Sequence, residues 1–173
     1  MKIRRGFVSN SSSSSFVVAF PKKPASVEEM RELLFKDVQS YPSPYDDFNY
    51  PATQIAEIVL QDMEEPLTDE EAIEEMIAGW WPYEKWALYE ELSGLKNIDW
   101  KNPKDRTKYD EAWKRFDDMR RADAKVVIAR WKGRYPNWQI FKFSYSDNDG
   151  AMSAALEHGG LFELLPHETI SHH

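Results

Sequence analysis

The side chains best suited to metal chemistry gather near the end of the chain. All four histidines lie within the last sixteen residues, and two aspartates stand shortly before them. Imidazole nitrogens and carboxylate oxygens are the usual ligands of zinc, manganese and non-haem iron. This mixture favours zinc or manganese over calcium. The candidate metal ligands are Asp147, Asp149, His158, His167 and His173.

The spacing of these residues matches no established metal signature. The sequence has no HExxH motif and no pair of histidines one helical turn apart. The tetrapeptide at 147–150, DNDG, resembles the start of a calcium loop. In such a loop a glutamate follows the glycine by six positions, but Leu156 stands there and Glu157 comes one position late. A strand-ending turn and a polar C-terminus without ligand function therefore remain the alternative interpretations.

A serine run near the start of the chain offers a second kind of chemistry. Five consecutive serines occupy 11–15, and they follow a pair of arginines. Hydroxyls, backbone amides and guanidinium groups bind anions, so a candidate anion site comprises Arg4, Arg5, Ser11, Ser12 and Ser13. The alternative is a low-complexity leader, although apolar residues on both sides of the run favour burial. A serine nucleophile is conceivable, but no GxSxG motif is present.

Short apolar runs at both ends of the chain predict the strands that would position these residues. Phe16 to Phe20 is a β-rich run that Pro21 ends, and residues 138–145 are rich in aromatic and β-branched side chains. A third, shorter strand is expected at 169–171. We expect the first two to lie in one sheet, with the DNDG turn and a short helix at 151–158 following the second.

Helical patterns fill the middle of the chain. Ser26 and Glu29 form a capping box for a helix ending near Phe35, and Thr68 begins a second capping box. Further helices are expected from Pro51, around 86–94, and from an Asn102 cap to about Lys132, whereas 37–50 is expected to be a loop. This order predicts an α+β fold, in which a small sheet from the chain ends is covered by helices at about 26–132, within one domain over 1–173.

Charge is distributed unevenly along the chain. The formal net charge is −8, yet residues 37–84 hold thirteen acidic residues and no Lys or Arg, and residues 101–134 hold twelve basic and six acidic residues. Overall acidity argues against nucleic-acid binding. The acidic segment 37–84 could bind a basic host protein, or the two segments could pair with each other, which is the commoner outcome. No apolar run is long enough to predict a membrane helix, and we expect a cytoplasmic protein without cysteine chemistry.

Both ends of the chain resemble segments of uncharacterised phage and bacterial proteins. The first similar segment is RGFVSNSSSSSF at 5–16, and the second runs from YSDNDG at 145–150 through Glu157, His158 and Pro166 to the final histidines. The resemblance implies a phage or mobile-element origin and favours treating the two ends as one unit. It implies no activity.

Three functions are open on these grounds. The first is a small cytoplasmic accessory protein with a site that joins the serine-rich and the Asp/His-rich ends. The second is a metal-dependent hydrolase, which needs its ligands to converge in a pocket. The third is a binding module that uses the acidic segment. Whether the protein is an enzyme is left undecided.

Overall fold

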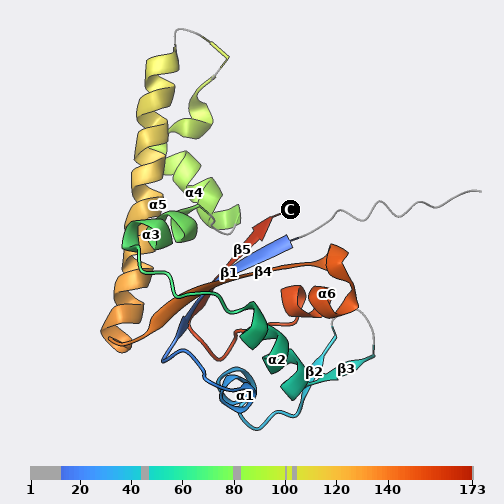
Figure 1. Ribbon diagram of the computed structural model, residues 1–173. Coiled ribbons are helices and arrows are strands. Elements are labelled where there is room, and N and C mark those ends of the chain that lie inside the picture. The colour runs from blue at the N-terminus through green and yellow to red at the C-terminus, as the bar shows by residue number, and fades with distance from the viewer. Residues whose placement is uncertain (1–12, 44–46, 80–82, 100, 103–104, 173) are drawn as a thin grey trace, which may run out of the picture. The chain divides into compact units, whose positions relative to one another are not determined.

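The computed structural model describes residues 13–43, 47–79, 83–99, 101–102 and 105–172. Its main sheet has the strand order β4-β1-β5, where β1 is Ser13–Phe20, β4 is Gln139–Ser146 and β5 is His167–His172 (Figure 1). β5 runs antiparallel to β1, in a register that pairs Ser13 with His172 and Val18 with His167. The predicted strands from both ends of the chain therefore share one sheet, and the α+β fold is confirmed.

The middle of the chain is largely helical, as predicted. Ser26 caps the first helix, because its hydroxyl accepts a hydrogen bond from the Glu29 amide at 3.3 Å. No helix in the part of the chain that the structure describes is long and apolar enough to cross a membrane. The helices are α1 (Val27–Phe35), α2 (Ala52–Asp62), α3 (Glu70–Ala78), α4 (Tyr83–Ser93), α5 (Arg106–Arg134) and α6 (Ala151–His158), with the short 3-10 helices η1 (Leu95–Asn97) and η3 (Asp147–Asp149).

Two helix boundaries differ from the prediction. Asp69, not Thr68, caps α3, because its carboxylate accepts from the amides of Glu71 at 3.0 Å and Ala72 at 3.3 Å. The predicted stop at Gly133 is also wrong, since α5 continues through that glycine to Arg134. At its other end α5 begins at Arg106, and the predicted start at 103–104 lies outside the described residues.

The expected loop at 37–50 contains a small hairpin. β2 (Ser40–Pro42) and β3 (Asn49–Pro51) pair antiparallel, with Tyr41 opposite Tyr50. Both tyrosines are buried. Two aromatic residues on facing strand positions stabilise such a pair of strands. Strands this short leave no periodic pattern in the sequence, so the hairpin is not predicted.

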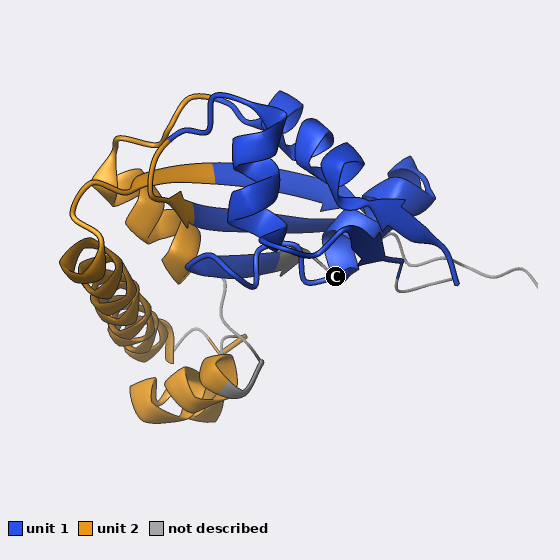
Figure 2. Ribbon diagram, turned by 90° about the horizontal axis from the view of Figure 1, so that it is seen from below, with its two compact units in different colours: residues 1–18, 23–64, 142–173 blue, residues 19–22, 65–141 orange. Residues whose placement is uncertain are grey.

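The chain forms two compact units (Figure 2). Unit 1 comprises residues 1–18, 23–64 and 142–173, and unit 2 comprises residues 19–22 and 65–141. The expectation of one domain over 1–173 stays a prediction.

Unit 1 has an aromatic core between its part of the sheet and the segment after α6. The Phe162 ring lies 5.3 Å from that of Phe16 on β1 and 5.0 Å from that of Phe143 on β4. Helices α1 and α2 pack against each other in the same unit. Burial of Phe16, Phe143 and Phe162 holds β1 and β4 in place, and the candidate site is built from the ends of these two strands.

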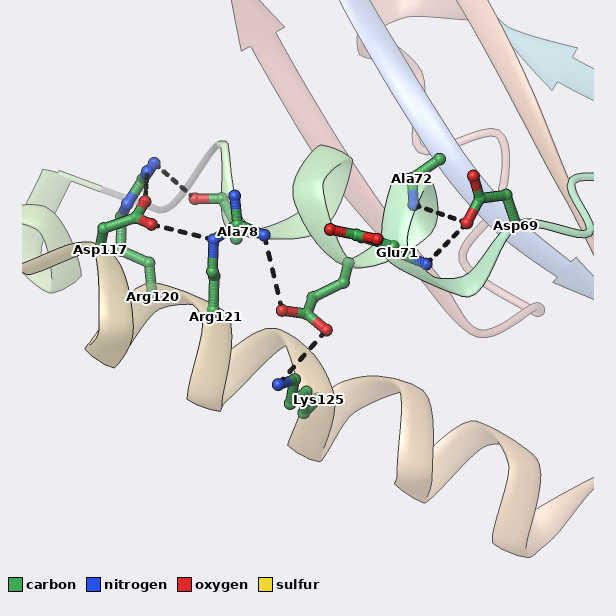
Figure 3. Close-up of polar contacts among 9 residues, drawn as sticks. Asp69, Glu71, Ala72, Ala78, Asp117, Arg120, Arg121 and Lys125 are labelled. Carbon is green, nitrogen blue, oxygen red and sulfur yellow. Dashed lines mark hydrogen bonds and ion pairs between the residues drawn. The ribbon is translucent and has the colours of Figure 1, made fainter. Parts of the chain in front are cut away.

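Unit 2 joins the acidic helix α3 to the basic helix α5. Glu74 of α3 lies 3.8 Å from the Arg121 guanidinium and 3.7 Å from the Lys125 ammonium. Arg120 donates to the carbonyl of Ala78 at 2.8 Å and so caps the C-terminus of α3 (Figure 3). The predicted pairing of the acidic and basic segments is thus present between these two helices.

Candidate metal centre

The candidate centre lies in unit 1, where the chain leaves β4 and returns along α6. The Ser146 hydroxyl accepts from the Asn148 amide at 3.3 Å, and the Ser146 amide donates to the Ser153 hydroxyl at 3.3 Å. Between them Gly150 has a φ of 104°, which favours glycine and turns the chain back. η3 therefore packs against α6, so that residues at its start reach those at the end of the helix.

This reversal brings together Asp147, Glu157 and His158. One possible ligand atom from each lies within 4.8 Å of those of the other two. Nε2 of His158 lies 3.4 Å from Oε2 of Glu157. Two carboxylates and one imidazole at this separation are close enough to bind a single ion after small side-chain adjustments.

Glu157 is the unusual member of the group. Its side chain is fully buried, and Oε1 accepts a hydrogen bond from the Ser14 hydroxyl at 3.1 Å. Oε2 is buried as well, but it accepts no hydrogen bond from any residue that the structure describes. A buried carboxylate oxygen without a donor is costly. The atom faces His158, so a cation between them would satisfy it.

A tyrosine from the small hairpin holds the C-terminal end of α6. The Tyr41 hydroxyl donates to the carbonyl of Ala155 at 3.0 Å. Burial, followed by the nearby charge of Glu163, raises the pKa of Tyr41, so the hydroxyl stays a donor. A side chain at Gly159 would overlap this hydroxyl and approach the Ala155 carbonyl to 2.7 Å. The end of the helix that carries Glu157 and His158 is thus fixed by close packing.

Of the metal ligands predicted from the sequence, the structure brings Asp147 and His158 together. Asp149 is exposed on η3 and does not belong to the group. His167 begins β5, where its Nδ1 lies 3.0 Å from the Leu165 carbonyl, and it is not in the group either. His173 lies outside the described residues.

Glu157 and Ser14 were not among the predicted site residues. The sequence does offer an indication for Glu157, because it directly precedes His158 and stands one position after the place where a calcium loop has its last glutamate ligand. Alternation along β1 puts Ser14 on the same face as Phe16, which points it toward the core. Of the predicted anion site, Ser13 is half-buried at the start of β1, whereas Arg4, Arg5, Ser11 and Ser12 lie outside the described residues.

Comparison with protein-family models, curated proteins and solved structures found no match. The resemblance to phage and bacterial proteins therefore stays a prediction, and the function has to be argued from the site itself.

Proposed function

We propose that this protein binds one divalent transition-metal ion through Asp147, Glu157 and His158. The observation that carries the proposal is the buried Oε2 of Glu157. It lacks a donor among the described residues and stands 3.4 Å from an imidazole nitrogen. A protein gains little from burying a carboxylate that is compensated only in part, whereas a bound cation converts the same atom into a ligand.

The donor set favours zinc or manganese. An imidazole nitrogen suits these ions better than calcium or magnesium, which prefer oxygen ligands throughout. Calcium also takes six to eight ligands, at least twice as many as the three side chains here supply with one atom each. His158 lies toward solvent, with 29% of its side chain exposed, which gives an ion a route of entry.

Three protein ligands also favour a metal-dependent hydrolase as a second candidate function. Catalytic zinc sites keep one coordination position for water or substrate, whereas structural sites are closed by four protein ligands. A zinc-bound water becomes a nucleophile near neutral pH, which is the chemistry that hydrolysis needs. Hydrolysis of a phosphate ester or an amide that depends on added metal and is lost in His158→Ala would support this function.

The acidic binding module has less support. Glu70 forms an ion pair with Lys132, and Glu74 lies near Arg121 and Lys125, so two of the carboxylates proposed for a partner already face cations of their own unit. Binding of a host protein by the segment 37–84 remains a proposal that no observation on the described residues supports.

Elemental analysis of tag-free protein tests metal binding directly. The protein is incubated with zinc or manganese, and unbound metal is then removed by dialysis. We expect about one equivalent per chain in the wild type and a large loss in His158→Ala. His167→Ala is the matched control, because that histidine lies outside the group. Less than about a tenth of an equivalent in the wild type, or equal loading of His158→Ala, would overturn the proposal.

A further inference from the structure

We infer that Ser14 determines which ions this centre accepts. The inference rests on the proposed metal binding and adds a specificity-determining residue to it. Ser14 holds one oxygen of Glu157 in a hydrogen bond, so that the carboxylate can ligate an ion only through the other oxygen.

The position of Ser14 is fixed by the sheet. It lies on β1, opposite Ser171 of β5, and only 3% of it is exposed. Two residues further on, Phe16 points from the same face of the strand into the aromatic core of unit 1. The hydroxyl therefore cannot move away with a flexible loop, because the backbone that carries it is paired with β5.

The bond divides the two oxygens of Glu157 between different tasks. Oε1 accepts from Ser14 at 3.1 Å, and Oε2 lies on the side of His158. A carboxylate held in this way is a monodentate ligand. Zinc and manganese sites use monodentate carboxylates readily, whereas calcium sites commonly reach their higher ligand number with a bidentate glutamate.

Hydrogen bonds to metal ligands also set affinity. A partner that fixes the orientation of a ligand typically contributes a factor of 10–100 to the binding constant. Loss of the Ser14 hydroxyl should weaken zinc binding through lost orientation and, at the same time, free Oε1 for a bidentate contact. The lost orientation should lower the affinity for zinc, whereas the additional bidentate contact should maintain or raise the affinity for calcium.

The ratio of the zinc and calcium binding constants therefore distinguishes a role of Ser14 in ion specificity from a purely structural role in packing. For Ser14→Ala we expect zinc affinity to fall about tenfold or more while calcium affinity stays constant or rises. A purely structural role of Ser14 would lower both affinities by the same factor. The constants are measured by competition with a chromogenic chelator, with zinc alone and calcium alone as probes.

Two further variants complete the test. Ser15→Ala is the matched control, because its hydroxyl bonds to Ser144 at 2.8 Å and alternation places it on the other face of β1. It should leave the ratio unchanged. Ser14→Thr keeps the hydroxyl and should restore most of the wild-type ratio, which covers the case in which Ser14→Ala folds poorly. A wild type that binds zinc and a Ser14→Ala variant with an unchanged ratio would overturn the inference alone. A wild type that binds no zinc would overturn the proposed function.

Discussion

Among the residues that the structure describes, two glutamates are buried, and their surroundings differ. Glu74 of unit 2 is 8% exposed, and Glu157 of unit 1 is 5% exposed. Glu74 lies within 4 Å of a guanidinium and an ammonium group on α5. The described neighbours of Glu157 are a serine hydroxyl, a second carboxylate and an imidazole. One carboxylate is compensated by cations of the chain, and the other is compensated only in part.

The difference shows how burial can be used to find a site. A buried charge with cations of its own chain around it belongs to the fold, because the fold itself compensates it. A buried charge that retains an oxygen without a donor indicates that something else completes its surroundings. Exposure alone would rank the two glutamates together, whereas their partners separate them.

Replacing each glutamate by glutamine gives the largest contrast that we expect. Glu157→Gln should lower zinc affinity by more than about 100-fold, because the variant removes a direct ligand. In the metal-free protein its melting temperature should stay constant or rise, since a neutral amide replaces a buried carboxylate that is compensated only in part. Zinc titration and thermal unfolding of the same samples measure both effects.

Glu74→Gln should show the reverse pattern. We expect it to lower the free energy of unfolding by about 1 kcal/mol, because Arg121 and Lys125 lose their shared partner, and to leave zinc affinity unchanged. If both variants lowered zinc affinity equally, the contrast between the two glutamates would have no functional meaning.

Much of the fold follows from local sequence signals. Phe16–Phe20 is apolar and buried throughout, as the sequence predicts. The strand after Trp138 is rich in β-formers and buries its aromatic residues, whereas Lys142 and Ser144 are exposed. Ser26 caps its helix because its hydroxyl is within reach of the Glu29 amide. Thr68 fails as a cap because Asp69, one residue closer to the helix, offers a carboxylate to two amides. Competition between adjacent caps depends on backbone geometry that the sequence does not contain.

The site is only half predictable for a related reason. Asp147 and His158 are recognisable because their side chains suit metals and a turn lies between them. Glu157 is adjacent to His158 in sequence, and its role depends on Ser14, which lies 143 residues away. The contact exists because β1 and α6 lie together in unit 1, and no local pattern indicates which serine of the run faces the helix.

The glycines of the two units allow a second contrast. An alanine at Gly159 would overlap the Tyr41 hydroxyl at the end of α6, whereas an alanine at Gly133 in α5 would meet nothing within 4 Å. We expect Gly159→Ala to destabilise the protein by about 1–3 kcal/mol through overpacking. Gly133→Ala should stabilise it by about 0.5–1 kcal/mol, because alanine favours helix.

Urea unfolding of both variants measures this contrast. The two changes in the free energy of unfolding should have opposite signs. A Gly159→Ala variant as stable as the wild type would mean that Tyr41 can move aside at little cost. The contact between Tyr41 and the end of α6 would then be too weak to hold Glu157 and His158 in place.

The smallest effect that we expect concerns acid stability in unit 2. Two hydrogen bonds lower the pKa of Asp123 below its usual 3.8. The larger effect comes from the Tyr89 hydroxyl, and the smaller comes from Lys85, whose ammonium lies 2.9 Å from the carboxylate. A carboxyl with a lowered pKa stabilises the folded state fully above its usual pKa, and this stabilisation is lost as the pH falls through the lowered value. Because 41% of the Asp123 side chain is exposed, solvent screens the interaction, and we expect it to contribute less than about 1 kcal/mol.

Thermal unfolding of the wild type and Asp123→Asn between about pH 7 and pH 2.5 tests this expectation. The wild type should be the more stable protein near neutral pH, and the difference should shrink once the pH falls below 3.8. Asp118→Asn, at an exposed aspartate on the same helix, is the control for the loss of one negative charge from α5. A constant difference between wild type and Asp123→Asn at every pH would show that Asp123 contributes by packing rather than by charge. The ion pairs of unit 2 would then explain less of its stability than the contrast between Glu74 and Glu157 implies.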